Sequence, residues 1–176
     1  NKGNDEVLSS SKQVEALFGN SRTFNTPAGL NTAASDDYGM TIELNDMLGY
    51  VDENLLNGMT WNVQDVAASQ YGDQTWEAEY NKIFTANLVI TQIGEIKDLT
   101  EANRTEYLAQ AHLMRATAMW NLANTYCMPY SRETASEPGL PLKTSTSYEE
   151  NVARSTLQQT YDFILVDLEE ALKTTN

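Results

Sequence analysis

The chain has 176 residues with 41% hydrophobic residues and a mean hydropathy of -0.47, which is typical of a globular domain that buries its own core. It carries 25 acidic against 11 basic residues, a net charge of -14, which repels phosphate backbones and anionic lipid surfaces, so we expect no nucleic-acid partner. No apolar run reaches the roughly 18 residues that span a bilayer. The first residues, Asn1 to Ser11, are polar and lack the features of a signal peptide, so we expect that any targeting segment has been removed.

The first third of the chain has one clear helix signal, followed by a segment rich in breaking residues. A helix is predicted to begin at the serine run 9–11, whose side chains can cap its first turn, and to end before Gly19. Residues 25–72 contain a proline and several glycines, which leave room for a short helical piece over residues 41–56. We expect this irregular part to matter for function, because loops on a rigid scaffold often carry it.

Two long helices are predicted next, over residues 76–96 and 107–126, joined by a short turn. Asp98 or Thr100 is expected to cap the second helix, and so short a connection makes the pair an antiparallel αα-hairpin. Gly94 continues the apolar face of the first helix, where glycine costs about 1 kcal/mol relative to alanine. We therefore expect another backbone to approach Gly94 closely.

The second helix of this hairpin is apolar on two nearly opposite faces, because each residue turns the helix by about 100°. One face holds Tyr107, Ala111, Met114, Ala118 and Leu122, and the other holds Leu113, Ala116, Trp120 and Ala123. A helix patterned in this way requires a neighbouring helix on each side. We therefore expect an inner helix of an all-α array.

The final third passes from an irregular segment to an amphipathic helix. Cys127 is expected to be a small buried hydrophobic residue, and the three prolines after it indicate an ordered surface loop rather than regular helix. Helix signals resume at Ser155 or Thr156, with a glutamine three positions later in a capping-box arrangement. An amphipathic helix this close to Asn176 needs a neighbouring segment to pack against, which predicts a fragment of a longer protein.

We treat residues 1–176 as one helical domain with four parts. They are an irregular opening region with short helices over residues 1–74, a helical hairpin over 75–126, a loop over 127–154 and an amphipathic helix over 155–176.

Several short motifs follow one another along the chain. They are Gln13-Val14-Glu15-Ala16-Leu17 with Ser35-Asp36-Asp37, Trp76-x3-Tyr80-x2-Ile83-x2-Ala86-Asn87, Leu113-Met114-Arg115-Ala116, Gly139-Leu140-Pro141-Leu142, and Arg154-Ser155-Thr156-Leu157 with Tyr161-Asp162-x-Ile164-Leu165-x-Asp167-Leu168-Glu169-x-Ala171. Their order and spacing together resemble the SusD/RagB family, the nutrient-binding lipoproteins of the Gram-negative outer membrane. One departure is Gln110, which stands where the family usually has Glu and removes one possible ion-pair partner for Arg115.

The resemblance implies an all-α protein of tetratricopeptide-like antiparallel helix pairs, in which this chain is the N-terminal portion. It also implies non-catalytic binding of an extracellular glycan or other nutrient, which a partner TonB-dependent transporter carries inward. The expected location is the outer-membrane surface, reached through a lipid anchor that this chain lacks. We expect no cofactor and no bound metal.

Arg115 is the only formal charge in residues 107–131, and we interpret it as a structural group. A charge in an apolar helix is usually paired, and loss of the partner costs about 3–5 kcal/mol; Asp167 or another acid of the last helix is the candidate partner. Asn87 lies among apolar positions, so its amide is expected to bond a neighbouring backbone group and is also interpreted as structural. His112 lacks the companions that a zinc site or a catalytic triad needs.

The ligand-binding prediction falls on the irregular region. A carbohydrate site needs an aromatic platform for the apolar face of the sugar, with amide or carboxylate groups that fix its orientation. Trp61 followed by Asn62 supplies both, and Tyr71 and Tyr38 are further candidates. In the SusD/RagB family, ligand contacts often come from this part of the chain. The alternative is that Trp61 anchors a core, as an isolated tryptophan ahead of a helix commonly does.

Two other function classes stay open beside glycan binding. A helical-repeat module would dock on the transporter with little ligand contact of its own. A glycosidase would need two acids about 5–10 Å apart across a cleft, and the adjacent Asp36 and Asp37 do not by themselves provide that geometry. With no nucleophile elbow or phosphate loop in the sequence, we expect no catalytic residue. A calcium loop around Asp52 fails because Leu56 occupies the position of the third oxygen ligand.

Overall fold

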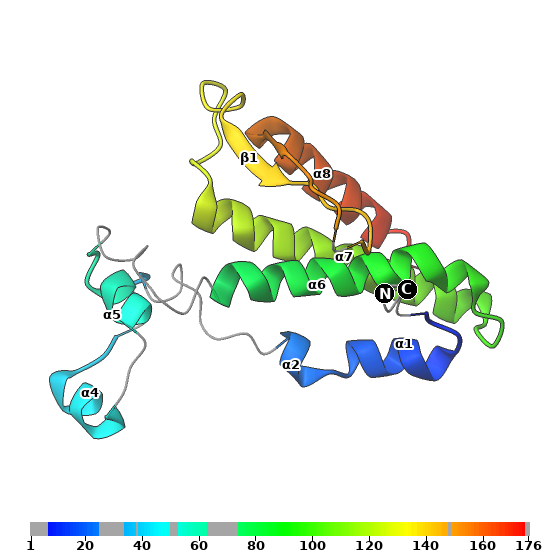
Figure 1. Ribbon diagram of the computed structural model, residues 1–176, viewed down its shortest axis with the longest axis horizontal. Coiled ribbons are helices and arrows are strands. Elements are labelled where there is room, and N and C mark those ends of the chain that lie inside the picture. The colour runs from blue at the N-terminus through cyan, green and yellow to red at the C-terminus, as the bar shows by residue number, and fades with distance from the viewer. Residues whose placement is uncertain are drawn as a thin grey trace. The chain divides into compact units, whose positions relative to one another are not determined.

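The computed structural model describes residues 7–24, 34–37, 39–49, 53–62, 74–147 and 149–174 (Figure 1). The chain divides into two units, one over Asn25–Ala78 and a larger one built from Asn1–Phe24 with Glu79–Asn176. Its described elements are helices apart from two short strands, and the long helices form tetratricopeptide-like antiparallel pairs, so the predicted fold class is confirmed. Within these residues no helix has both the length and the apolar character needed to cross a bilayer.

Helix α1 (Ser11–Phe18) begins where the serine run predicted it, and α2 (Ser21–Phe24) follows. Two side chains hold the first turn of α1. The Gln13 carboxamide oxygen accepts from the amides of Ser9 and Ser10, at 2.7 and 3.2 Å. The Asp98 carboxylate accepts from the amide and the hydroxyl of Ser11, both at 2.9 Å. Asp98 therefore ties the start of α1 to the turn of the hairpin that follows much later in the chain.

Asp98 makes the attachment of α1 dependent on pH. Hydrogen bonds from the backbone and hydroxyl of Ser11 lower the pKa of Asp98 below its ordinary value of 3.8. A lowered carboxyl pKa stabilises the fold above the unfolded value, and this contribution disappears as the pH falls through the folded value. We expect Asp98→Asn to be less stable than wild type at neutral pH, with the difference shrinking below about pH 4. Urea unfolding followed by circular dichroism across this range measures it, and a difference that does not change with pH would contradict it.

The predicted hairpin is formed by α6 (Gln74–Gln92) and α7 (Glu101–Tyr126), with the short 3-10 helix η2 (Ile93–Glu95) between them. Thr100 caps α7, since its hydroxyl accepts from the Asn103 amide at 3.2 Å. Arg104 secures the turn by donating to the carbonyls of Ile93 and Ile96. The close backbone approach expected at Gly94 is wrong: a Cβ there would meet no atom within 4 Å. Gly94 lies in η2, beyond the end of α6.

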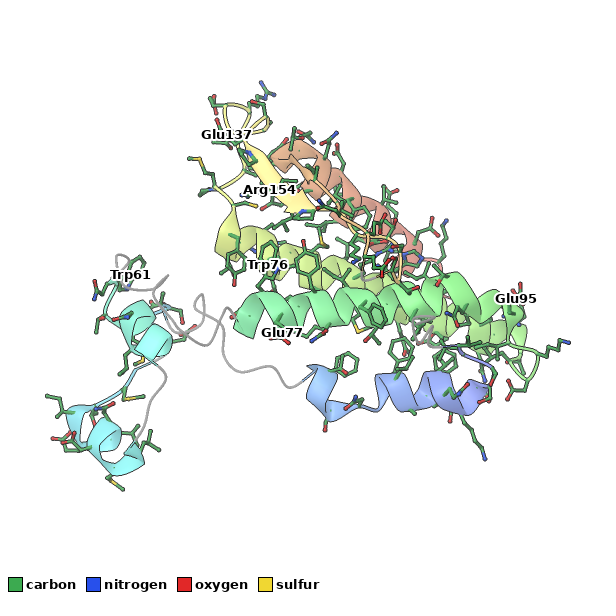
Figure 2. The ribbon with its side chains drawn as sticks, in the orientation of Figure 1. Trp61, Trp76, Glu77, Glu95, Glu137 and Arg154 are labelled. Carbon is green, nitrogen blue, oxygen red and sulfur yellow. The ribbon has the colours of Figure 1, made fainter. Side chains whose placement is uncertain are left out.

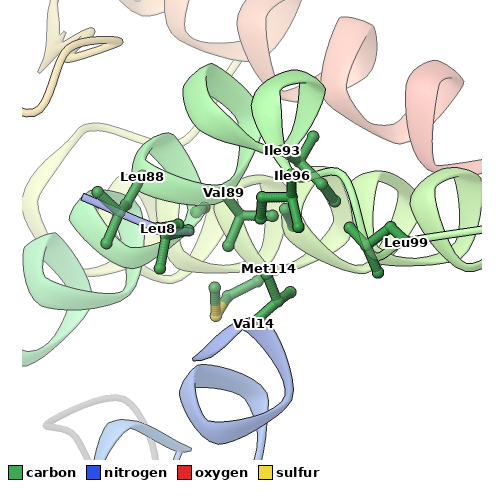
Figure 3. Packing of buried hydrophobic residues seen from close by; sticks show 10 residues of the cluster. Leu8, Val14, Leu88, Val89, Ile93, Ile96, Leu99 and Met114 are labelled. Carbon is green, nitrogen blue, oxygen red and sulfur yellow. The ribbon is translucent and has the colours of Figure 1, made fainter. Parts of the chain in front are cut away.

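The core of the larger unit lies where α1, α6 and α7 meet (Figure 3). Val14 of α1 is fully buried against this core, and the Phe18 ring stacks on Tyr107 of α7 with a centroid distance of 5.8 Å. The buried cluster comprises Leu8, Val14, Ala86, Leu88, Val89, Ile93, Ile96, Leu99, Ala111 and Met114. One apolar face of α7 is therefore covered by α6 and α1, as the sequence pattern required.

The last helix, α8 (Leu157–Ala171), packs on α7 and begins beside a two-stranded antiparallel sheet. Thr156 caps it, with the Gln159 side chain completing the predicted capping box. The sheet pairs β1 (Pro138–Pro141) with β2 (Arg154–Thr156), which the sequence did not predict. Before β1, the chain supplies carbonyls of Ala135 and Glu137 to the first amides of α8, at 2.9 and 2.8 Å. The loop therefore serves as a cap for the helix.

The second apolar face of α7 is only partly covered. Ala116 and Ala123 are buried, but Leu113 and Trp120 are 51% and 52% exposed. The expectation that α7 is covered on both faces is therefore confirmed for the face toward α6 and α1. On the opposite face the cover is only partial. Cys127, at the end of α7, is half-buried rather than buried, and burial raises the pKa of its thiol.

In the unit over Asn25–Ala78 the predicted helical piece is two short helices, α4 (Ile42–Leu48) and α5 (Glu53–Met59). Thr41 caps α4 by accepting from the Leu44 amide at 3.2 Å, and Gly49 ends the helix with a φ of 66°. A left-handed residue after a helix is usually glycine. The corresponding position after α5 is occupied by a residue other than glycine.

Candidate functional site

Helix α5 ends in a left-handed cap whose central residue is a tryptophan. The Asn62 amide donates to the Asn57 carbonyl at 2.8 Å, and the Trp61 amide donates to the Gly58 carbonyl at 3.2 Å. These are the two hydrogen bonds of a Schellman motif, in which the left-handed residue is usually glycine. Trp61 has a φ of 55°, an outlying conformation for a bulky residue that costs about 1–3 kcal/mol. Such conformations are concentrated at functional sites.

The cap holds the Trp61 indole in solvent, as Figure 2 shows at the end of α5. Its side chain is 71% exposed, which does not fit the alternative of a core anchor. On the helix side the Thr60 hydroxyl donates to the Leu56 carbonyl at 2.9 Å, and the Asn62 carboxamide reaches Asn57 Oδ1 at 3.4 Å. An indole and a carboxamide are therefore carried by adjacent residues at the end of α5.

The other predicted ligand residues have different outcomes. Tyr38 and Tyr71 lie outside the described residues. Asp36 and Asp37 are exposed in a short turn. Among the described residues, no group of three or more His, Cys, Asp or Glu side chains could hold a metal ion.

A buried polar network connects α6, α7 and α8. Asp167 is 1% exposed and receives two hydrogen bonds from Arg115, one from Nε and one from Nη2, each 2.7 Å long. The remaining Arg115 nitrogen, Nη1, donates to the Asn87 side-chain oxygen at 2.6 Å. The predicted pairing of Arg115 with an acid of the last helix is confirmed, and Arg115 forms it in the bidentate geometry typical of strong arginine–carboxylate pairs.

The network continues into the loop after β1. The Asn87 amide nitrogen donates to the carbonyls of Lys143 and Ser145, at 3.0 and 3.2 Å, as the backbone bonding predicted for Asn87 requires. His112 Nδ1 lies 2.7 Å from Asp167 Oδ1. Burial raises the pKa of Asp167, but the hydrogen bonds from Arg115 and His112 outweigh it and lower the pKa overall.

Sequence reasoning missed two members of this network. One is the contact between His112 and Asp167, and the other is Phe163, whose ring lies 4.9 Å from the Arg115 guanidinium carbon. A signal was present for both. His112 lies three residues before Arg115, and Phe163 lies four before Asp167, so each shares a helix face with a paired residue. The network's polar groups are bonded to one another and to backbone, as buried polar groups generally are.

Comparison with known proteins identifies the family. A SusD-like family model, described as starch-binding and associating with the outer membrane, matches residues 9–174. The chain belongs to the SusD-like family. The resemblance read from the motifs is therefore confirmed, and the match covers the two units described above. No curated protein matches the chain in sequence.

Solved structures of SusD-like and related proteins share the fold. A candidate sugar-binding protein of Bacteroides vulgatus superposes with a TM-score of 0.70 at 14% identity over 98% of this chain. A SusD superfamily protein of Bacteroides thetaiotaomicron gives 0.69 at 18% identity over 96%, and a laminarin-binding SusD-like protein gives 0.66 at 18% over 95%. The chain spans only 38%, 38% and 34% of the lengths of these three proteins.

Proposed function

We propose that this chain is part of a non-catalytic outer-membrane surface protein that holds an extracellular glycan, or another nutrient, for import through a partner TonB-dependent transporter. Two comparisons support a glycan as the ligand. The family model is described as starch-binding, and one structural neighbour is a laminarin-binding protein. The transporter and the surface location follow from the resemblance to the SusD/RagB family.

The observation that carries the ligand contact is the exposed indole of Trp61. Sugars present apolar C–H faces bordered by hydroxyls, so an aromatic platform with an adjacent amide suits them. Trp61 supplies the platform at 71% exposure and Asn62 supplies the amide. The left-handed φ of Trp61 adds a second argument, because glycine would relieve the strain there and tryptophan does not. Asn62, Tyr38 and Tyr71 are proposed as further ligand contacts.

We expect Trp61→Ala to weaken glycan binding by the full-length protein at least about tenfold, which corresponds to about 1.4 kcal/mol. The reason is loss of the indole face, since alanine leaves the cap otherwise unchanged. Calorimetric titration with soluble β- and α-glucan oligosaccharides, chosen after a glycan-array screen, measures the change.

Two control variants separate stacking from folding. Trp61→Gly removes the indole but relieves the left-handed strain, so it should bind as weakly as Trp61→Ala while being more thermally stable. Trp61→Phe retains an aromatic face and should recover part of the affinity. Unchanged binding in both Trp61→Ala and Trp61→Gly would remove Trp61 from the site. Tight binding of peptides with no response to any glycan would overturn the carbohydrate part of the proposal.

A second candidate function is docking on the transporter by the helices themselves. Helix α4 favours it, because none of its residues is buried, and Ile42 and Met47 are 79% and 83% exposed. Exposed apolar side chains gathered on one short element are a common mark of protein–protein contact. Capture of a membrane transporter that is lost in Met47→Glu, with glycan binding intact, would support docking through α4.

A further inference from the structure

An exposed tyrosine lies in the loop that follows α7. Tyr130 is 44% exposed, and its ring packs against the ring of Tyr161 in α8. The ring centroids are 5.1 Å apart, and the ring planes are inclined at 56°. Tyr161 is partly buried, so it supports the Tyr130 ring from the helix while Tyr130 remains open to solvent. The two residues form an inclined aromatic pair at the protein surface.

Polar groups border this aromatic pair. The Tyr130 hydroxyl donates to the Gln158 side-chain oxygen, and Gln158 Nε2 donates to Asp162 Oδ1 at 2.8 Å. Asp162 is exposed, so its carboxylate is open to a further donor. We call Tyr130, Tyr161, Gln158 and Asp162 the tyrosine surface. It combines aromatic rings with an amide and a carboxylate, which are the groups that a carbohydrate site requires.

The backbone around Tyr130 is held on both sides by one side chain. The Thr134 hydroxyl donates to the Pro129 carbonyl at 2.8 Å and accepts from the Ser131 amide, also at 2.8 Å. The same loop then caps the first amides of α8, the helix that carries the other members of the tyrosine surface. A side chain presented by so well-fixed a backbone loses less freedom when a ligand binds, which favours affinity.

We propose that the tyrosine surface is a second glycan contact in addition to Trp61, an inference that rests on the proposed function. Trp61 belongs to the unit over Asn25–Ala78, whereas Tyr130 belongs to the larger unit. The ligand class is a polysaccharide, because the family model is described as starch-binding and a structural neighbour as laminarin-binding, and both glycans are glucose polymers. A polymer repeats its recognised unit, so it can use a contact that a short oligosaccharide leaves empty.

Two other occupants of an aromatic surface fit less well. Nucleic-acid bases also stack on aromatic rings, but the net charge of -14 and the Asp162 carboxylate beside Tyr161 repel phosphates. A closely packed protein partner would take the Asp162 carboxylate and the Gln158 amide out of water, which costs free energy unless matching groups replace it. A hydroxyl-rich ligand supplies such groups directly or through bridging water.

Tyr130→Ala tests the proposal in the full-length protein, with Met128→Ala as the matched control. Met128 lies in the same loop and is 56% exposed, but it carries no ring. We expect Tyr130→Ala to weaken binding of soluble starch or laminarin at least about fivefold, because it removes the exposed ring. Tyr130→Phe keeps the ring and should retain most of the affinity. Electrophoresis through gels containing the polysaccharide measures the affinities, and circular dichroism checks that each variant is folded.

Oxidative footprinting locates the contact independently of affinity. Hydroxyl radicals should oxidise Tyr130 in the free full-length protein, and at least about threefold more slowly when the polysaccharide is bound, because the ligand buries the ring. Tandem mass spectrometry assigns the oxidation to Tyr130 rather than to Met128. Protection of Tyr130 already in the free protein would show that another part of the polypeptide covers it, and would overturn the proposal.

The binding series separates this proposal from the role of Trp61. Unchanged binding in Tyr130→Ala, or equal weakening in Met128→Ala, would overturn the tyrosine surface alone. Weakening in Tyr130→Ala with unchanged binding in Trp61→Ala would support the tyrosine surface and remove Trp61. If the wild-type protein binds neither polysaccharide nor any shorter glycan, both proposals are overturned.

Discussion

Asp167→Ala is expected to lower the free energy of unfolding by about 3–5 kcal/mol. The change removes the two carboxylate oxygens that accept from Arg115, a residue only 7% exposed, and leaves the Asn87 side-chain oxygen as the acceptor of Nη1. It also removes the group that His112 contacts. Leaving a buried arginine without a counter-charge costs more free energy than the intact pair contributes to stability. The reason is that nothing then offsets the desolvation of the charge. Urea unfolding of the purified full-length protein, followed by circular dichroism, measures the loss.

A double variant separates the buried charge from the lost contacts. Arg115→Met combined with Asp167→Leu replaces the pair by apolar side chains of similar volume, a change that is often nearly neutral in proteins. Asn87 keeps its hydrogen bonds to Lys143 and Ser145 in that background. We therefore expect the double variant to be more stable than Asp167→Ala alone. If the free energy of unfolding of Asp167→Ala lies within about 1 kcal/mol of the wild-type value, the Arg115–Asp167 pair contributes little to the stability of the fold.

Gly139→Ala is expected to lower the free energy of unfolding by about 3 kcal/mol through overpacking. A Cβ on Gly139 would lie 2.2 Å from the Thr160 hydroxyl and 2.4 Å from the Thr156 carbonyl oxygen. The second contact is with backbone at the very start of α8, so relief requires β1 to move off the helix. Such a movement would also break the hydrogen bond from the Leu140 amide to the Thr160 hydroxyl, which is 3.0 Å long. The same unfolding measurement tests it.

Gly94→Ala is the matched control for that experiment. A Cβ there meets nothing within 4 Å, and Gly94 is not among the positive-φ residues. Replacement by alanine at an unstrained site restricts the unfolded chain and stabilises by about 0.4–1 kcal/mol. The two glycine variants should therefore differ in sign. Equal changes in the free energy of unfolding would mean that the lost freedom of the backbone, rather than the space available for the added Cβ, determines both results.

Local sequence chemistry predicted the helices and their caps. Long periodic patterns marked α6 and α7, and the Thr156–Gln159 capping box placed the start of α8 correctly, because both signals depend only on near neighbours. Pairing of Arg115 with an acid of the last helix was also predictable, since a lone charge in an apolar helix demands a partner. Local patterns sufficed wherever one helix face or one cap decided the outcome.

The errors have separate physical causes, and only the first is a distant contact. The segment Pro138–Pro141 has no alternating pattern and contains two prolines, yet it forms β1 because β2 pairs with it and the Thr160 hydroxyl of α8 accepts from the Leu140 amide. Gly94 was misread because its cost was judged as that of a residue inside a helix, whereas α6 ends at Gln92. The left-handed φ of Trp61 had no sequence signal, since glycine is the residue that such a cap normally predicts.

The span of the buried network has a consequence for the order of folding. Arg115 and Asp167 are 52 residues apart in the chain, whereas the α6–α7 hairpin is closed by a turn of a few residues. Nearby contacts form faster because they require less loop closure. The hairpin is therefore expected to form first, with Arg115 still hydrated, and α8 to dock on it late. In that sequence of events, Asp167→Ala accelerates unfolding and leaves the refolding rate nearly unchanged.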